Sequence, residues 1–415
     1  MHARKHFEPE FSNDRLKNTG NCWQFSVQPP TGANARLYIN LGCNQALNDC
    51  LPCKNIEGRR AIGCLDSGDQ YMPKALWPDH PSCLWARDFP RQRDEREKKL
   101  SSRAFIFPGQ GSQDVGMGKA IAEAFPAARA VFEEVDEALG EKLSQLIWDG
   151  PKDQLTLTAN AQPALMAVSM AIIRVLEAEQ GLDLAKHVSF VAGHSLGEYS
   201  ALAAAGTFKL GDAARLLRAR GKAMQAAVPV GEGAMVALLG VGMDVAKVVA
   251  SEAAQGEVCQ VANDNDPTQV VLSGAKAAID RVAEVGKAHN VRRAIPLPVS
   301  APFHCAMMQP AAVVMAEALG EVEMLAPKVP VVANVTAQPT TDPDKIRAQL
   351  IAQVTGTVRW RECMLAMIAA GVTNFYEVGS GKVLSGLVRR IERSAEGQTI
   401  GSPDEIAAMG GILGA

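Results

Sequence analysis

The sequence has no run of 18 consecutive apolar residues and no large excess of charge of either sign. The first lack argues against a membrane span. The second leaves a formal net charge of −3, which gives no sign of general nucleic-acid binding. The remaining composition, 47% hydrophobic and 21% charged over 415 residues, is ordinary for a soluble globular protein with a sizeable core and more than one domain.

Cysteine is scarce in most of the chain and unevenly distributed. Six of the nine cysteines precede Ser101, and the three that follow, Cys259, Cys305 and Cys363, are scattered. So few and so dispersed thiols favour a reducing cytoplasm over a disulfide framework.

Residues 1–100 show no sustained apolar period of 3.6 or 2 residues. They also lack a basic segment followed by an apolar stretch, and they are too acidic for a transit peptide. Cys50-x-x-Cys53, with Cys43 and Cys64 nearby, leaves a zinc site as an alternative, but a second spaced pair is missing. We therefore expect an irregular extension, disordered or non-native, read from upstream of the true start codon.

From Arg103 onward, Ala-rich helical patterns alternate with short Val, Ile and Phe runs, which is the rhythm of an α/β protein. Strands are predicted at 103–107, 188–193 and 373–379, each followed by a loop or a helix. This alternation predicts a mostly parallel sheet covered on both faces. We expect this α/β core to comprise residues 103–227 and 301–400.

Between residues 228 and 300 the order of predicted elements changes to β-α-β-β-α-β, the ferredoxin-like pattern. The segment leaves and re-enters the larger layer at nearby points, as an inserted subdomain does. A cleft between the two parts is the expected position of an active site. Residues 401–415 are left as a tail.

Two glycine-rich loops fail as nucleotide sites. The third glycine of a dinucleotide fingerprint is replaced by Asp114. A phosphate-loop match near the C-terminus has Tyr376 for its first glycine and Val383 for its serine or threonine.

Gly193-His194-Ser195-Leu196-Gly197 matches G-x-S-x-G between a predicted strand and a predicted helix, the context that this motif requires. A sharp strand-to-helix turn brings backbones close together, which explains the glycines. The turn leaves the serine at a helix N-terminus, where unpaired N–H groups favour developing negative charge. A small residue in a tight turn is the alternative, and the strand-to-helix context favours a nucleophile.

A serine nucleophile needs a general base. His194 adjoins the serine, and neighbouring side chains on a sharp turn diverge, while His187 and His289 lie in polar stretches. His304 lies where the segment 228–300 rejoins the larger layer, beside the expected cleft. It is our candidate base, with a structural loop histidine as the alternative.

One arginine lies within an apolar helical face. At 100° per residue, Leu216, Leu217 and Met224 share a face with Arg220. A cation that points into the protein is costly unless it is paired. Its partner is either a buried carboxylate or an anionic substrate, and the planar guanidinium suits a carboxylate.

Together these residues resemble the malonyl-CoA:acyl-carrier-protein transacylase family, which includes the acyltransferase domains of fatty-acid and polyketide synthases. The resemblance extends from about Arg103 to Ser394 and rests on seven motifs in order: "FPGQGSQ", "NAQPAL", "GHSLGEYSAL", "RGKAMQ", "GAMVALLG", "PVSAPFHCAMM" and "EVGSGKVLSGL". It implies a hydrolase-like parallel-sheet core with an inserted ferredoxin-like subdomain. It also implies transfer of a malonyl group from malonyl-CoA, through a serine ester, to the phosphopantetheine thiol of acyl carrier protein.

The resemblance implies a catalytic pair, an oxyanion hole, a substrate pocket and two residues that orient the base. The catalytic pair is Ser195 and His304, and the oxyanion hole consists of the backbone N–H groups of Gln110 and Leu196. The substrate pocket contains Arg220, Gln162 and His194. The base is oriented by the backbone carbonyl of Gln353 and by Asn334. A third, acidic triad member is not expected, and neither is a metal or an organic cofactor.

Lys382, Arg389 and Arg390 form a candidate docking patch, because carrier proteins are acidic. A solvated helix face is the alternative for these three residues.

Two rival functions use the same motif differently. A serine esterase or thioesterase would need a Ser-Asp-His triad, for which Asp264, Asp266 and Asp280 lie in the required order along the chain. Such an enzyme has no use for Arg220. A carrier-binding protein without activity is the second rival, and an intact Ser195 and His304 argue against it.

Overall fold

The computed structural model describes residues 17–18, 22–27, 35–40, 102–299 and 301–413. The chain divides into two compact units, residues 1–91 and 92–415. In the first unit the described residues form an antiparallel sheet in the order β1-β2-β3. Its strands are β1 (Lys17–Asn18), β2 (Cys22–Val27) and β3 (Ala35–Asn40).

The expectation of an irregular segment over residues 1–100 is wrong for these three strands, and elsewhere in the segment it lies outside the described residues. The sequence signal of a strand is present but short: Trp23, Phe25 and Val27 alternate with polar residues along β2. The zinc alternative lies outside the described residues, at Cys43, Cys50, Cys53 and Cys64.

A six-stranded sheet forms the centre of the second unit, in the order β11-β10-β5-β4-β12-β13. Every neighbouring pair in it is parallel except β10 and β11, as the alternation of strands and helices predicts. The strands are β4 (Arg103–Phe107), β5 (Phe190–Gly193), β10 (Val331–Val332), β11 (Pro339–Thr340), β12 (Asn374–Val378) and β13 (Glu396–Ile400).

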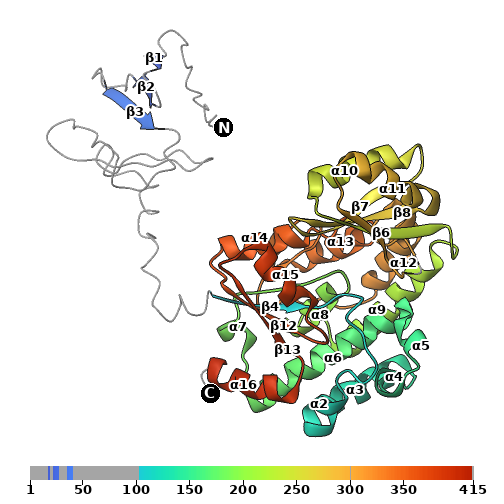
Figure 1. Cartoon of the computed structure of the whole chain (residues 1–415). Coiled ribbons are helices and arrows are strands. Elements are labelled where there is room, and N and C mark those ends of the chain that lie inside the picture. Colours follow the sequence, from blue (N-terminus) through green and yellow to red (C-terminus); the bar gives the residue numbers. More distant parts are fainter. Residues whose placement is uncertain (1–16, 19–21, 28–34, 41–101, 300, 414–415) are drawn as a thin grey trace, which may run out of the picture. The chain divides into compact units, whose positions relative to one another are not determined.

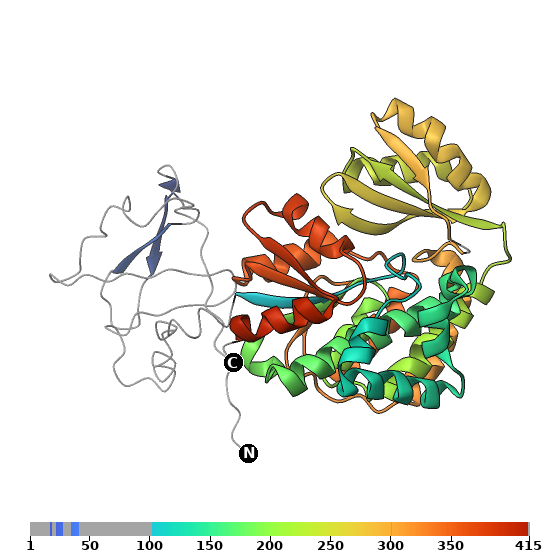
Figure 2. The same cartoon turned by 60° about the horizontal axis from the view of Figure 1, so that its bottom comes forward.

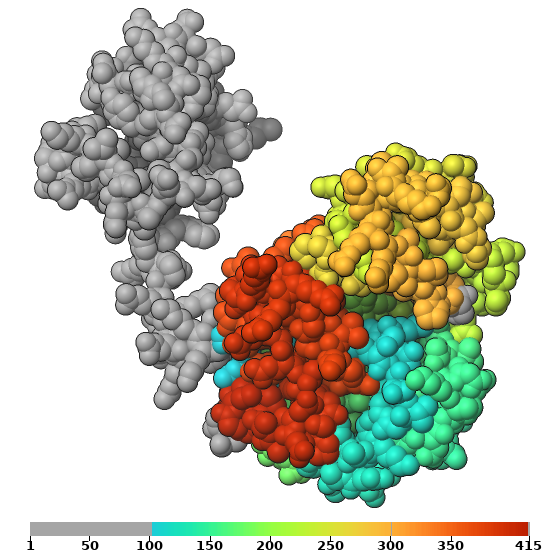
Figure 3. Space-filling view, viewed as in Figure 1, coloured from blue at the N-terminus to red at the C-terminus, as the bar shows by residue number. Residues whose placement is uncertain are grey.

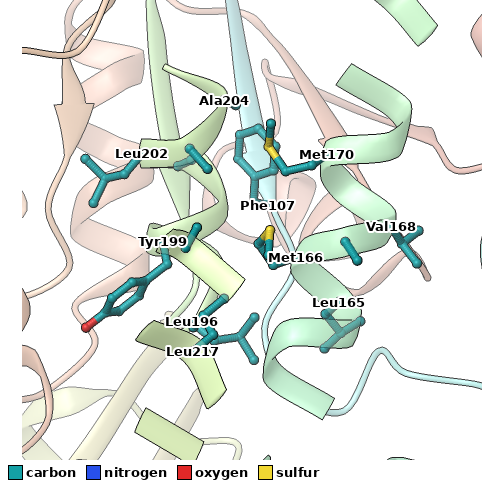
Figure 4. Packing of buried hydrophobic residues seen from close by; sticks show 14 of the residues in the cluster. Phe107, Leu165, Met166, Val168, Met170, Leu196, Tyr199, Leu202, Ala204 and Leu217 are labelled. Carbon is teal, nitrogen blue, oxygen red and sulfur yellow. The ribbon is translucent and has the colours of Figure 1, made fainter. Parts of the chain in front are cut away.

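Helices cover both faces of this sheet (Figures 1 and 2). Successive side chains of a strand point to opposite faces, and β4 accordingly contributes Phe105 and Phe107 to one apolar cluster and Ala104 and Ile106 to another. Figure 4 shows Phe107 beside methionines of α6 in the first, larger cluster. The helices around the sheet are α2 (Lys119–Ala124), α3 (Pro126–Leu139), α4 (Leu143–Asp149), α5 (Lys152–Thr156), α6 (Thr158–Glu179), α7 (Leu184–His187), α8 (Gly197–Ala204), α9 (Leu210–Ala226), α12 (Gln309–Gly320), α13 (Pro343–Gln353), α14 (Trp360–Ala369), α15 (Val383–Ile391) and α16 (Pro403–Leu413), with a 3₁₀ turn, η2 (Ala306–Met308).

The predicted ferredoxin-like segment forms a separate antiparallel sheet in the order β7-β8-β6-β9. Two helices pack on this sheet around an apolar cluster of their own. The elements, in chain order, are β6 (Gly233–Leu239), α10 (Met243–Ala254), β7 (Cys259–Asp266), β8 (Gln269–Ala275), α11 (Lys276–Ala288) and β9 (Arg293–Pro296). In Figure 3 the surface is hollowed where this subdomain, coloured yellow to orange, meets the core.

Most of the segment 401–415, which the sequence leaves as a tail beyond the core, forms α16. Ile406, Met409 and Leu413 recur at helical spacing and are buried in the larger cluster of the core. The short apolar repeat thus marks a packed helix.

Among the described residues one helix, α6, is long and apolar enough to cross a membrane, although polar residues interrupt it. Of its most apolar 18-residue window, 83% is buried inside the protein. Such burial is typical of the core helix of a soluble domain.

Candidate active site

Ser195 lies on a sharp turn between β5 and α8. Its φ of 54° is in the left-handed region of backbone conformation, which residues other than glycine rarely adopt. A Cβ on Gly193 would lie 1.9 Å from the backbone of Gly197, and one on Gly197 would lie 2.3 Å from the carbonyl oxygen of Phe107. Both glycines of the motif are therefore required by backbone contacts at the turn.

The loop after β4 runs directly beside this turn. β4 and β5 are parallel neighbours, and the His194 N–H donates to the Phe107 carbonyl at 3.0 Å. A Cβ on Gly109 would lie 2.8 Å from the His194 carbonyl oxygen, so the next residue, Gln110, is held close to the serine turn. Among the described residues, the backbone N–H groups of Gln110 and Leu196 donate to no protein acceptor. Both amides are thus available to a ligand.

His304 contacts the Ser195 hydroxyl directly. Its Nε2 lies 2.8 Å from Ser195 Oγ, and its Nδ1 donates to the Gln353 carbonyl oxygen at 2.9 Å. Because Nδ1 carries the proton, Nε2 is left as an acceptor for the serine hydroxyl. Burial lowers the pKa of His304 to about 3, and the nearby Arg220 charge acts in the same direction, while the bond to Gln353 opposes both. The imidazole is therefore neutral, as a base must be.

His194 turns away from the serine, as two neighbours on a sharp turn are expected to do. Its Nε2 lies 2.9 Å from Asn265 Oδ1 of β7, and its ring centre lies 5.6 Å from that of Trp360. Burial lowers the pKa of His194, and the bond to Asn265 opposes this. His194 thus joins the serine turn to the ferredoxin-like subdomain.

The three aspartates of the esterase rival are engaged elsewhere. Asp264 pairs with Arg361 at 2.9 Å, and Asp280 pairs with Lys276 at 2.5 Å. Asp266 accepts from Thr268 and lies 3.5 Å from Arg390. The His304 imidazole is oriented by a backbone carbonyl, so no Ser-Asp-His triad is assembled from these residues.

Arg220 reaches the Ser195 hydroxyl from α9. The residue is 1% exposed, and its guanidinium donates to Gln162 Oε1 at 2.9 Å, Gln353 Oε1 at 2.8 Å and Ser195 Oγ at 3.1 Å. It also lies 5.6 Å from the centre of the Tyr199 ring, a favourable cation–π distance. No carboxylate of the described residues is within the 4.0 Å of a salt bridge. The alternative of a direct ion pair is therefore wrong within that part of the chain.

Two buried amide side chains hold the serine turn in place. Asn334, in the turn between β10 and β11, accepts from the Ser195 N–H at 2.8 Å and donates to the Gly193 carbonyl at 2.8 Å. Gln353, at the end of α13, donates from Nε2 to the Ser195 carbonyl at 3.0 Å. Both residues are fully buried, and their hydrogen bonds to the backbone of Gly193 and Ser195 fix the conformation of the turn.

Glu198 is a residue of this network that the sequence interpretation missed. It is 1% exposed, and its Oε2 accepts from Gln353 Nε2 at 2.7 Å and from the Asn334 N–H at 3.0 Å. Burial raises its pKa to about 7, against the hydrogen bonds from these two residues and the charge of Arg220. The available signal was that Glu198 is the only charged residue of α8; Arg220 was singled out by a related signal, a charged residue on the apolar face of its helix.

The candidate docking residues lie at the surface of α15 and just before it. Lys382, Arg389 and Arg390 are exposed. Arg390 also lines a cavity of about 360 Å³ together with Arg292 and Arg293 of the subdomain. Among residues 102–299 and 301–413, no three His, Cys, Asp or Glu side chains are grouped as metal ligands.

Comparison of the sequence with known proteins gives one consistent family. Residues 104–401 match the model of the acyl transferase domain. The chain is 45% identical over 308 residues to the malonyl CoA-acyl carrier protein transacylase of Bacillus subtilis, covering 74% of this chain and 96% of that protein. It is 44% identical over 309 residues to the protein of the same name from Escherichia coli K12, covering 74% of this chain and 99% of that protein.

Solved structures agree with the sequence relatives. The acyl-carrier-protein S-malonyltransferase of Bartonella henselae has 56% identity and a TM-score of 0.74, covering 76% of this chain and all of that one. A malonyl-transacylase solved in complex with a type II polyketide-synthase acyl-carrier protein has 40% identity and a TM-score of 0.71, covering 74% of this chain and 98% of that one.

Proposed function

The chain belongs to the acyl transferase domain family, among its malonyl-CoA:acyl carrier protein transacylases, and on that premise we propose a role for each residue of its site. The enzyme transfers the malonyl group of malonyl-CoA to the phosphopantetheine thiol of acyl carrier protein, for fatty-acid or polyketide synthesis. The observation that carries the assignment of roles is the chain of contacts from Arg220 through Ser195 and His304 to the Gln353 carbonyl.

Acylation begins with the attack of Ser195 Oγ on the thioester carbonyl carbon. His304 Nε2 takes the hydroxyl proton as the carbon–oxygen bond forms. The negative charge that develops on the carbonyl oxygen is stabilised by the N–H groups of Gln110 and Leu196; a lost donor of this kind typically costs about 3–4 kcal/mol. The carbon–sulfur bond then breaks, and His304 returns the proton to the departing coenzyme A sulfur.

The second half of the reaction repeats these steps in reverse. The phosphopantetheine thiol gives its proton to His304, its sulfur attacks the serine ester, and Ser195 Oγ leaves with the proton. Each step moves one proton through one imidazole, so these residues carry both half-reactions without a redox change. Neither step calls for a metal or an organic cofactor.

Arg220 holds the malonyl carboxylate in this proposal. The guanidinium reaches Ser195 Oγ, and its hydrogen-bond partners among the described residues are neutral amides and hydroxyls, so an incoming carboxylate supplies a direct counter-ion. Gln162 fixes one end of the guanidinium. His194, which borders the turn and contacts the subdomain, forms part of the wall of the acyl pocket.

The carrier protein docks on the basic surface of α15 in this proposal. Lys382 and Arg389 are exposed, and Arg390 shares its cavity with two further arginines. Acidic side chains of a carrier protein suit such a surface.

We also propose that the enzyme works in the cytoplasm. Cys259, Cys305 and Cys363 are buried free thiols, which is typical of proteins in a reducing compartment.

Incubation with radiolabelled malonyl-CoA tests the assignment of the catalytic pair. We expect the wild-type protein to hold one stable malonyl ester, seen by mass spectrometry, and Ser195→Ala to hold none while keeping its melting temperature. His304→Ala should slow ester formation by about 10²- to 10⁴-fold, the usual contribution of a general base. Malonyl label on the Ser195→Ala protein would contradict the assignment of Ser195 as the nucleophile. Rapid release of free malonate by the wild-type protein would contradict the transacylase mechanism.

A further inference from the structure

Two side chains that can carry opposite charges are buried at the active site without touching each other. Arg220 and Glu198 are each 1% exposed, and neither has an oppositely charged partner within 4.0 Å among the described residues. A buried charge without compensation is costly. The charges of Arg220 and Glu198 must therefore be compensated by the polar groups that lie between the two side chains.

The side-chain amide of Gln353 lies between the two charges. Its Oε1 accepts from the Arg220 guanidinium at 2.8 Å, and its Nε2 donates to Glu198 Oε2 at 2.7 Å. The amide dipole is thus aligned with both charges, its oxygen toward the cation and its nitrogen toward the anion. Arg220 and Glu198 are compensated through a single fully buried amide.

Only one orientation of this amide fits its surroundings. Besides Glu198, the Nε2 group faces the Ser195 carbonyl at 3.0 Å and Asn334 Oδ1 at 3.3 Å, and all three of these atoms accept hydrogen bonds. A reversed amide would place its oxygen against three acceptors and its NH₂ against the Arg220 guanidinium. Glu198 contributes the shortest of the three contacts and the only one from an ionisable group.

We propose that Glu198 is a positioning residue for malonyl selectivity: its carboxylate fixes the Gln353 amide, which in turn holds the Arg220 guanidinium beside Ser195. The inference rests on the proposed role of Arg220 as the carboxylate-binding residue. Glu198 itself contacts neither Ser195 Oγ nor His304. Its other side-chain bond, from the Asn334 N–H at 3.0 Å, supports the serine turn and so serves every acyl group alike. An effect of Glu198 on selectivity therefore passes through the Gln353 amide. An uncharged acyl group such as acetyl does not use this relay.

Substitution of Glu198 should therefore change selectivity more than chemistry. We expect Glu198→Ala to lower the ratio of malonyl-CoA to acetyl-CoA kcat/KM for acylation of Ser195 by about ten- to hundredfold, the range for a lost hydrogen bond to a charged group. Glu198→Gln keeps an acceptor oxygen of the same reach but no charge, so its ratio should fall between those of Glu198→Ala and the wild type. Single-turnover acylation followed by mass spectrometry measures both substrates directly.

A double-mutant cycle with Arg220 decides how Glu198 acts. In the Arg220→Ala background, Glu198→Gln should leave the malonyl-to-acetyl ratio unchanged, because the residue through which it acts is gone. An equal loss for both substrates in the single variants, or the same change of ratio with and without Arg220, overturns the proposal. If Glu198→Ala does not fold, as judged by circular dichroism, Glu198→Gln alone carries the test, and an unchanged ratio in it overturns the proposal.

The same measurements separate this inference from the proposed function. A wild-type protein that forms no malonyl ester on Ser195 contradicts the proposed site. A wild-type protein that forms the ester and prefers malonyl, with Glu198 variants that keep this preference, contradicts only the relay.

Discussion

Charged residues that helices turn toward the protein interior are concentrated beside Ser195. Arg220 interrupts the apolar face of α9, and Glu198 is the only charged residue of α8. Burial lowers the pKa of Arg220 and raises the pKa of Glu198, so both positions cost folding free energy. A position that is costly to folding and lies beside a nucleophile is best explained by what it does for the substrate.

Arg220 should decide between malonyl and acetyl groups. Removal of one partner of a buried charge pair typically costs about 2–5 kcal/mol, or about 30- to several-thousand-fold in kcat/KM for malonyl-CoA at roughly 1.4 kcal/mol per tenfold. Acetyl-CoA has no carboxylate, so Arg220→Ala should leave acetyl transfer unchanged or raise it. Arg220→Lys should fall between, because an ammonium keeps the charge but loses the two-pronged geometry.

The measurement is kcat/KM for both acyl-CoA substrates on the wild type and the two variants. Equal losses for malonyl-CoA and acetyl-CoA would show that Arg220 only supports the structure around Ser195, and the malonyl assignment would lose its main residue-level support.

At the scale of elements, the strand–turn–helix unit of β5 and α8 depends on close backbone contact. We expect Gly197→Ala to destabilise the protein by about 3 kcal/mol or more, since the added Cβ would lie 2.3 Å from the Phe107 carbonyl oxygen and backbone atoms cannot move aside easily. Chemical denaturation followed by circular dichroism gives the free energy of unfolding.

Gly386 in α15 provides the matched control. A Cβ there meets nothing within 4 Å, and alanine is favoured over glycine inside a helix by about 1 kcal/mol. Gly386→Ala should therefore leave stability unchanged or raise it. A Gly197→Ala protein as stable as the Gly386→Ala protein would show that the turn has room to relax.

Much of this element arrangement could be predicted from the sequence. Short apolar runs and G-x-S-x-G indicate the β4, β5 and α8 region, and the change of rhythm after residue 228 indicates the ferredoxin-like subdomain. Helical periodicity also places Arg220 correctly on the buried face of α9. These features are local, and local patterns are what periodicity reports.

The contacts between distant segments could not be predicted in this way. Gln353 meets Ser195 and Glu198 across 158 and 155 residues of chain, and no spacing rule relates positions so far apart. The family resemblance predicts that the backbone carbonyl of Gln353 orients His304. It does not predict that the side-chain amide of Gln353 contacts Arg220 and Glu198. The packed α16 was missed because its repeat is short and rich in glycine and alanine.

At the scale of the whole molecule, the enzyme is expected to need only the second unit. The family model matches residues 104–401, and all described residues of the site lie in that range. A chain beginning near Ser102 should keep its melting temperature and its rate of malonyl transfer, both measured against the full chain. Loss of soluble folding on truncation would show that residues 1–101 support the core.

The order in which the site's parts occur along the chain has a consequence for synthesis on the ribosome. Ser195 is made before the Gln353 carbonyl that orients His304, which follows 158 residues later. At about 5–20 residues per second, the growing chain carries the serine for roughly ten to thirty seconds before its imidazole can be anchored. The central strand β4 stays without its neighbouring strand β12 for longer still, because β12 is made near the end of the chain. A chain that ends before Gln353 lacks the carbonyl that accepts from His304 Nδ1, so we expect its serine to take up no malonyl group before the protein is able to hand that group to a carrier.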